Sequence, residues 1–431
     1  MQVTIHRGTK EIGGTLIELR TSATRILIDA GYPLFLNNAP IDDDIAKLPH
    51  TELLALGVLP KIEGLYAWDE AGFDAVVISH AHIDHYGLLR YVNSAIPVYM
   101  SAGTERLIQI SRLFRICQGH DSEVRRFRMY RSFRIGDIKL KPYLMDHSAF
   151  DAAAFEISAE GKTVTYSGDF RGHGRKSICL DRFITAAKKR PDVLLIEGSM
   201  LGRADEQTMT ETELEDAVVE RMKQVDYPLL FQCSSQNIDR LVSFFRASLR
   251  LRRVFVVDIY TANVLHELRQ FKNNLPYPSP QYPNIKVFFP YRLTQRIFND
   301  VGEQYARRFS EHHISREGVR EAQGHIVMAC RPSMGTDIRR CGLHDGVLLY
   351  SLWRGYRNQA YQQAFETYLK KVGFSLEALH TSGHATIPDL RRVIDGLDPQ
   401  RLVPIHTMHP DAFRGFSSKT EFMQDGVEWE L

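Results

Sequence analysis

The sequence predicts an α/β protein made of two unlike parts, and three observations lead to this prediction. The chain has 431 residues, which is too long for one ordinary hydrophobic core and suggests two or three domains. Residues 1–205 contain short apolar or alternating segments separated by turns, which are typical of strands. In residues 206–365 such strands alternate with helices, so we expect a separate α/β domain there.

The first part begins with two predicted strands. Residues 14–20 and 24–29 are apolar or alternate between apolar and polar, and Ala30-Gly31 ends the second strand. Residues 32–70 carry little pattern and are expected to form a long surface excursion. Helices are predicted from residue 87 and over 104–116. The remaining predicted strands of this part are 73–79, 97–100, 133–135, 138–140, 155–158, 163–167 and 192–196.

The second part begins with a capping box, in which Thr210 precedes Glu213 by three residues and starts a helix to about Gln224. Strands that alternate with helices indicate a mostly parallel sheet covered on both faces. The strands are predicted at 228–232, 253–258, 285–289, 326–330 and 347–352, and the helices between them include 238–249, 264–271 and 295–309. Residues 366–431 add a strand near 376–380, a helix over 388–394 and a strand over 401–405.

Composition narrows the class of protein. A hydrophobic fraction of 44% and a charged fraction of 25% are typical of a globular protein, and a net charge of +2 indicates no particular partner. The five cysteines contain no C-x-x-C pair, which argues against a disulfide framework and a cysteine zinc site. The N-terminus shows no signal peptide, and no apolar stretch is long enough to span a membrane. We therefore expect a cytoplasmic protein with no membrane association.

The run His80-Ala-His-Ile-Asp-His85 directly follows the apolar strand predicted at 73–79. Neutral imidazoles and a carboxylate are ligands that suit zinc and divalent metals of similar preference. Because Asp84 and His85 are adjacent, on any ordinary backbone they diverge from His80 and His82. The motif therefore predicts two metals side by side rather than one.

Three further ligand candidates stand where predicted strands end: His147, Asp169 and His406. They supply the ligands that the first cluster lacks. Two metals held about 4 Å apart can share a hydroxide and clamp a phosphoryl oxygen. The expected ligand sets are His80, His82 and His147 for one metal, and Asp84, His85 and His406 for the other, with Asp169 bridging both.

The order His-x-His-x-Asp-His, then His, then Asp, then His resembles the metallo-β-lactamase superfamily. This resemblance implies an αββα sandwich with its metals along one edge of the strands. The long separation between Asp169 and His406 is similar to that of the β-CASP branch, whose members cut nucleic acids and carry an inserted α/β domain. Residues 206–365 would then be the β-CASP domain with its mostly parallel sheet, and residues 366–431 would complete the domain begun by 1–205.

Further motifs of the branch are present. Glu197 in Ile196-Glu-Gly-Ser, His384 in Thr381-Ser-Gly-His-Ala and His406 in Pro404-Ile-His resemble its three additional motifs. A histidine at the third motif is typical of members that cut RNA. Gly8-Thr-Lys-Glu-Ile-Gly-Gly and Ser235-Gln-Asn-Ile-Asp-Arg240 resemble segments of ribonuclease J.

The resemblance implies a metal-dependent ribonuclease that hydrolyses phosphodiester bonds with a hydroxide activated by two Zn²⁺ or Mn²⁺ ions. Asp84 would ligate one metal and orient the hydroxide, and His384 would contact the scissile phosphate. Asp29 and Glu197 would hold ligand imidazoles through their other ring nitrogen. The implied partner is RNA in single-stranded form, and the chain is expected to be able to form a homo-oligomer.

Departures from the family pattern leave alternatives open. Gly198 stands where the branch usually has a hydroxyl residue, and Cys330-Arg-Pro-Ser-Met-Gly-Thr replaces a glycine- and serine-rich loop of ribonuclease J. Exonuclease or endonuclease action, 5′-end preference and oligomeric state therefore stay open. The alternative functions are a DNA exonuclease of the same branch, a hydrolase of small esters, thioesters or lactams, and a metal-bound scaffold or RNA-binding protein without activity.

Overall fold

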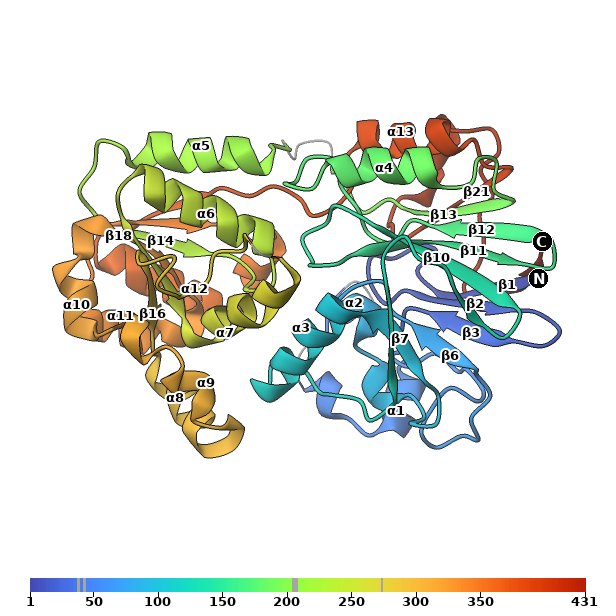
Figure 1. Cartoon of the computed structure of the whole chain (residues 1–431), viewed down its shortest axis with the longest axis horizontal. Coiled ribbons are helices and arrows are strands. Elements are labelled where there is room, and N and C mark those ends of the chain that lie inside the picture. Colours follow the sequence, from blue (N-terminus) through green and yellow to red (C-terminus); the bar gives the residue numbers. More distant parts are fainter. Residues whose placement is uncertain (37–38, 42–43, 204–207, 273) are drawn as a thin grey trace. The chain divides into compact units, whose positions relative to one another are not determined.

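The computed structural model describes residues 1–36, 39–41, 44–203, 208–272 and 274–431. The chain divides into two compact units (Figure 1). Unit 1 comprises Met1–Glu206 and Gly383–Leu431, and unit 2 comprises Gln207–Ser382.

The second boundary falls between Ser382 and Gly383, whereas the sequence analysis expected it between residues 365 and 366. The physical reason is strand pairing. β20 (Ser375–Ala378) pairs in parallel with β19 (Val347–Tyr350), so this segment belongs to the sheet of unit 2. The first boundary lies one residue from the expected position.

Unit 1 is a sandwich of two sheets. Its core joins Val3, Ile17 and Ile28 of the first sheet to Phe155 and Ile157 of the second. In spatial order the first sheet contains β22 (Glu428–Glu430), β1 (Gln2–Arg7), β2 (Leu16–Arg20), β3 (Arg25–Ile28), β6 (Ala75–Val77), β7 (Val98–Ser101) and β8 (Val124–Phe127). The second contains β21 (Arg401–Ile405), β13 (Val193–Glu197), β12 (Lys162–Tyr166), β11 (Ala153–Ala159), β10 (Ile138–Leu144) and β9 (Phe133–Ile135).

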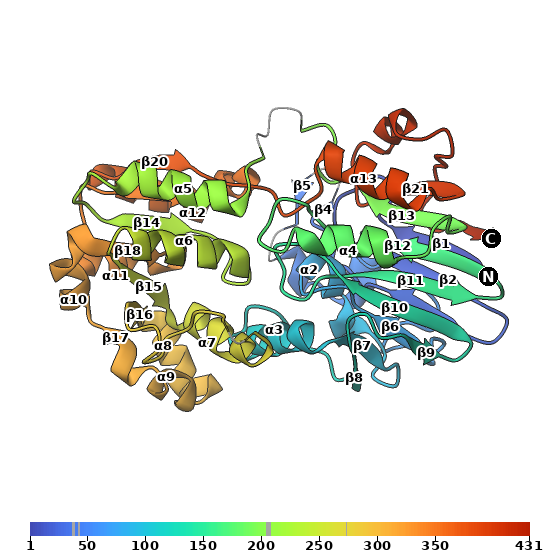
Figure 2. The same ribbon diagram turned by 45° about the horizontal axis from the view of Figure 1, so that its top comes forward.

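Helices pack against both sheets of this sandwich (Figure 2). α4 (Ile178–Ala186) and α13 (Ile387–Leu397) pack on the second sheet, where Phe183 and Leu390 meet Leu194 in one apolar cluster. α3 (Ala102–Leu113) contacts β7 and β8 of the first sheet. The predicted αββα layering is therefore confirmed.

The C-terminal segment completes both sheets of unit 1. β21 pairs in parallel with β13 in the second sheet, and β22 pairs antiparallel with β1 in the first. Strands from before and after the long insertion therefore belong to the same two sheets.

Unit 2 contains a seven-stranded sheet in which every recorded pairing is parallel. Phe231 of the sheet stacks on Phe244 of α6 (Ile238–Arg250) at 4.0 Å between ring centroids. The mostly parallel sheet predicted for this region is confirmed. Besides β19 and β20, its strands are β17 (His313–Ile314), β16 (Ile285–Phe288), β15 (Val254–Asp258), β18 (Ile326–Ala329) and β14 (Leu229–Gln232).

Two sequence expectations about local structure are wrong. The helix expected over 295–309 is broken into α8 (Tyr291–Arg296), a π-helical turn and α9 (Gln304–Arg307), because Gly302 has φ +123° and ends the helical backbone. The stretch 32–70 is more than a surface excursion. Its described part contains α1 (His50–Ala55) and the fully buried side chains Leu53, Val58, Leu59 and Leu65.

In the part of the chain that the structure describes, no helix combines the length and the apolar character that crossing a membrane requires.

A buried ion pair supports unit 2. Arg240 of α6 and Glu211 of α5 (Glu211–Met222) are both fully buried, with Nε and Nη2 of Arg240 each 3.1 Å from a carboxylate oxygen of Glu211. Nη2 also donates to the carbonyl oxygen of Thr381 at 3.0 Å, and the Ser243 hydroxyl donates to Glu211 at 2.7 Å. The pair is therefore well supplied with hydrogen bonds, which a buried ion pair requires.

We expect Arg240→Met to destabilise unit 2 by about 3–5 kcal/mol, because it leaves the Glu211 carboxylate buried without a countercharge. Hydrogen exchange of α5 and α6 peptides in a urea series measures this. The matched control is Arg221→Met, since Arg221 pairs with Glu377 on side chains that are 39% and 35% exposed. That exposed pair should contribute about 1 kcal/mol or less. Equal effects of the two substitutions would contradict the prediction.

Candidate metal centre

Four elements of unit 1 end at the same place and bring the ligand candidates together. His80 and His82 follow β6, and α2 (Ile83–Tyr86) carries Asp84 and His85. β10 and β12 run in the same direction because both pair antiparallel with β11, and β13 and β21 continue the sheet in parallel with β12. Their carboxyl ends therefore lie along one edge of the sheet. The loops after β10, β12 and β21 place His147, Asp169 and His406 at that edge.

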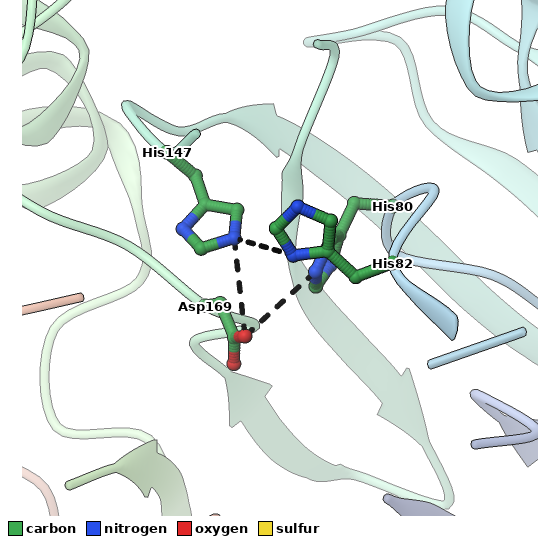
Figure 3. A group of neighbouring side chains, drawn as sticks. All are labelled: His80, His82, His147 and Asp169. Atoms are coloured by element: carbon green, nitrogen blue, oxygen red, sulfur yellow. Dashed lines mark hydrogen bonds and ion pairs between the residues drawn. The ribbon is translucent and has the colours of Figure 1, made fainter. Parts of the chain in front are cut away.

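The first group of ligand atoms consists of His80 Nε2, His82 Nδ1, His147 Nε2 and a carboxylate oxygen of Asp169 (Figure 3). His147 Nε2 lies 3.1 Å from His82 Nδ1. Asp169 Oδ2 lies 3.7 Å from His80 Nε2 and 4.0 Å from His147 Nε2. These four residues can offer atoms that all lie within 4.8 Å of one another.

A second group lies on the other side of Asp169 and consists of Asp84, His85 and His406. Asp84 Oδ2 is 3.7 Å from His406 Nε2 and 4.0 Å from His85 Nε2. Asp169 Oδ2 is 3.2 Å from His85 Nε2 and 3.8 Å from His406 Nε2. The structure therefore brings all seven predicted ligand residues together, with Asp169 between the two groups.

The chemistry of this donor set fits divalent metal ions. Among the described residues, the buried Nε2 atoms of His80, His85 and His406 have no well-aligned hydrogen-bond partner. Unpaired buried polar atoms are costly, and their presence is expected where a ligand completes the site. Burial also lowers the pKa of His80 and His147 well below the usual histidine range and the pKa of His82 to about 4. Neutral imidazoles, which metal ligation requires, are thus favoured.

The carboxylates of Asp169 and Asp29 have the opposite effect on His85, whose pKa they raise. Burial would lower the pKa of His85, but the charges of Asp169 and Asp29 outweigh it and raise that pKa well above its ordinary value. Burial would likewise raise the pKa of Asp169, but His406 and His85 hold it well below its ordinary value. Negative charge is thus concentrated at the point where the two groups of imidazoles meet.

Asp29 lies where the sequence analysis expects it. Its Oδ2 accepts a hydrogen bond from His85 Nδ1 at 2.8 Å, so the opposite ring nitrogen of His85 faces Asp169. Asp29 directly follows β3 and has φ +60°, a left-handed conformation that turns its side chain toward this site. The hydroxyls of Ser79 and Tyr166 donate to the same carboxylate oxygen at 2.7 Å.

Glu197 differs from the expectation, because it contacts His384 rather than any of the expected ligand imidazoles. Glu197 ends β13, and its Oε1 accepts the backbone N–H of Phe170 at 2.8 Å. Its Oε2 lies 3.0 Å from His384 Nδ1. Burial would lower the pKa of His384, but Glu197 and Asp169 outweigh it and raise that pKa to about 9.

His384 itself lies at the edge of the second group. Its Nδ1 is 3.7 Å from Asp169 Oδ2, and its side chain is 22% exposed. Asp169, His384 and His406 can also offer atoms that lie close enough to hold one ion. The residue is thus both adjacent to the ligand cluster and open to solvent.

Two further groups hold the ligand rings and were not singled out from the sequence. The carbonyl oxygen of Gly383 lies 2.6 Å from His147 Nδ1. The Ser79 hydroxyl lies 3.0 Å from His80 Nδ1. A backbone carbonyl has no signature in a sequence, and only the position of Ser79 beside His80 could have indicated its contact.

Two family models match the chain in separate segments. Residues 24–226 match the beta-lactamase superfamily domain, and residues 371–419 match the Zn-dependent metallo-hydrolase RNA specificity domain. The second match begins in unit 2 and ends in unit 1, just beyond His406.

Curated relatives are similar at low identity. An RNase J-like protein of Methanocaldococcus jannaschii is 25% identical over 299 residues, covering 65% of this chain and 63% of its own length. Ribonuclease J of Helicobacter pylori strain B128 is 21% identical over 432 residues, covering 94% of this chain and 56% of its own length. The chain thus spans about 60% of the length of these relatives.

A solved structure, a protein of unknown function from Enterococcus faecalis V583, matches with a TM-score of 0.80 and 20% identity. The match covers 100% of this chain and 99% of that one, and it supports the fold. The family models, the curated relatives and the order of the ligand residues identify the family. The chain belongs to the β-CASP branch of the metallo-β-lactamase superfamily and is ribonuclease J-like.

Proposed function

We propose that this chain is a metal-dependent nuclease that hydrolyses phosphodiester bonds of single-stranded RNA. The observation that carries the proposal is the convergence of seven histidine and aspartate side chains, with the carboxylate of Asp169 between two groups formed by the other six. The match of residues 371–419 to an RNA specificity domain and the names of the curated relatives support RNA as the substrate.

The proposed ligands of the two ions follow from the two groups of side chains. Imidazole and carboxylate donors suit Zn²⁺, with Mn²⁺ as the alternative. When bound, two such ions lower the pKa of water and stabilise negative charge on a phosphodiester. His80, His82 and His147 would hold one ion, Asp84, His85 and His406 would hold the other, and Asp169 would contact both.

Two residues would act on the reacting groups directly. Asp84, whose side chain is 12% exposed, would orient the attacking water by accepting a hydrogen bond from it. His384, held through Nδ1 by Glu197, would use its other ring nitrogen to contact the scissile phosphate. An imidazolium at that position stabilises the charge that builds on the phosphate oxygens.

We expect His80→Ala and Asp84→Ala each to weaken metal binding by more than about 100-fold, because even groups that only orient ligands contribute about 10- to 100-fold. Cleavage of RNA should fall to background in both variants. Metal content by mass spectrometry and cleavage of labelled RNA measure the two effects. His344→Ala is the control, since this exposed histidine of unit 2 pairs with its neighbour Asp345. Wild-type cleavage rates in either ligand variant would contradict the proposal.

His384→Ala should lower kcat by about 10²- to 10³-fold, the effect of removing one group that stabilises transition-state charge. We expect its metal content to stay at the wild-type value, because the proposed ligand sets do not require His384. Single-turnover cleavage of RNA and metal analysis on the same preparation separate these effects. An unchanged kcat would show that His384 does not contact the reacting phosphate.

The substrate class is tested by comparing RNA with its alternatives. We expect end-labelled single-stranded RNA to be cleaved faster than DNA of the same sequence, and a chromogenic lactam to be left intact. RNA and DNA bearing 5′-phosphate, 5′-triphosphate or 5′-hydroxyl ends, with product lengths read on gels, also distinguish exonuclease from endonuclease action. Turnover of the lactam or of DNA alone would favour the corresponding alternative function.

A further inference from the structure

Thr15 contacts two members of the second group of ligand residues, His406 and Asp84. Its hydroxyl oxygen lies 2.9 Å from His406 Nδ1, and both residues are buried. Its backbone N–H donates to the carbonyl oxygen of Asp84 at 3.2 Å, and its carbonyl oxygen accepts from Gly31 at 3.0 Å. One residue near the N-terminus therefore contacts two of the three residues proposed to hold the second ion.

The turn that precedes Thr15 depends on glycine. Gly8, Gly13 and Gly14 have φ values of +117°, +90° and +70°, which residues with a Cβ rarely adopt. At Gly13 a Cβ would also meet Leu34 at 2.7 Å and the Asp84 side chain at 3.2 Å. The glycines therefore let the chain between β1 and β2 fold closely against the cluster and bring Thr15 to His406.

His406 needs external support because it has φ +50°, an uncommon conformation for a residue other than glycine. Its backbone N–H donates to the carbonyl oxygen of Gly8 at 2.7 Å, and its carbonyl oxygen accepts from the Ser199 hydroxyl at 3.2 Å. These contacts hold the backbone. Among the described residues, the recorded hydrogen bond of the imidazole is the one to Thr15.

This hydrogen bond selects the ring nitrogen that faces the other ligands. His406 Nε2 lies 3.7 Å from Asp84 Oδ2 and 3.8 Å from Asp169 Oδ2. For Nε2 to offer its lone pair to a metal, the neutral ring must carry its proton on Nδ1. In that tautomer the Thr15 oxygen can accept the Nδ1 proton, so the contact holds the ring with Nε2 toward the other ligand residues.

We propose that Thr15 is a positioning residue for the second metal site and has no comparable effect on the first. This inference rests on the proposed function, because it assumes that the cluster binds two divalent ions. The first group, His80, His82 and His147, has its own ring contacts through Ser79 and Gly383. Loss of the Thr15 hydroxyl should therefore lower the binding affinity for the ion of the second site and leave the affinity for the other ion unchanged.

The test is a Zn²⁺ titration of the apo full-length chain by calorimetry, with stoichiometry checked by mass spectrometry and Co²⁺ absorption spectra recorded in parallel. Thr15→Val and Thr15→Ala remove the hydroxyl, and Thr15→Ser keeps it. We expect one ion to bind as in the wild type and the other to bind about 10- to 100-fold more weakly in the first two variants. Thr15→Ser should restore both affinities.

Thr165→Val is the matched control, because Thr165 is fully buried in β12 of the same unit and, among the described residues, its hydroxyl has no hydrogen-bond partner. It should bind two ions as the wild type does. Unchanged affinities in Thr15→Val, equal weakening of both ions, or loss of fold in both Thr15→Val and Thr15→Ala would overturn the inference. A wild-type chain that binds no metal would instead refute the proposed function, so the two failures are distinguishable.

Discussion

The carboxylate of Asp169 is the group on which the candidate site depends. It is 2% exposed, and one of its oxygens lies 3.2–4.0 Å from ring nitrogens of His80, His85, His147 and His406. A buried carboxylate is costly unless opposite charge or hydrogen-bond donors surround it. Because Asp169 lies three residues after the end of β12, which is paired on both sides, this negative charge is held close to a rigid part of the sandwich.

The groups that orient the ligand rings also connect the two sheets of unit 1. Asp29 follows β3 of the first sheet, and it accepts hydrogen bonds from the Tyr166 hydroxyl of the second sheet, from Ser79 and from His85. A carboxylate with this many donors has little freedom to move. The ring of His85 is therefore oriented by contacts that also hold the sandwich together, which is the arrangement expected of a preorganised metal site.

The two stretches of unit 1 that precede and follow unit 2 in the sequence both contribute residues to the candidate site. The chain leaves unit 1 shortly after Glu197 and returns at Gly383, and Glu197 contacts His384 at 3.0 Å. The returning segment also supplies the Gly383 carbonyl oxygen to His147. Residues of unit 1 on either side of the insertion in the sequence thus take part in the candidate site.

The sequence by itself determined the mostly parallel sheet of unit 2 and the ligand run His80-Ala-His-Ile-Asp-His85, because the alternation of strands with helices and the spacing of ligand residues are local signals. The αββα class followed from the resemblance that the order of the histidines and aspartates carries. Their roles as metal ligands stay predictions. Only the tertiary structure decided that Glu197 contacts His384, that β20 belongs to unit 2 and that Thr15 meets His406. These contacts join residues far apart in the chain, and a hydroxyl or a backbone carbonyl carries no sequence pattern that identifies its partner.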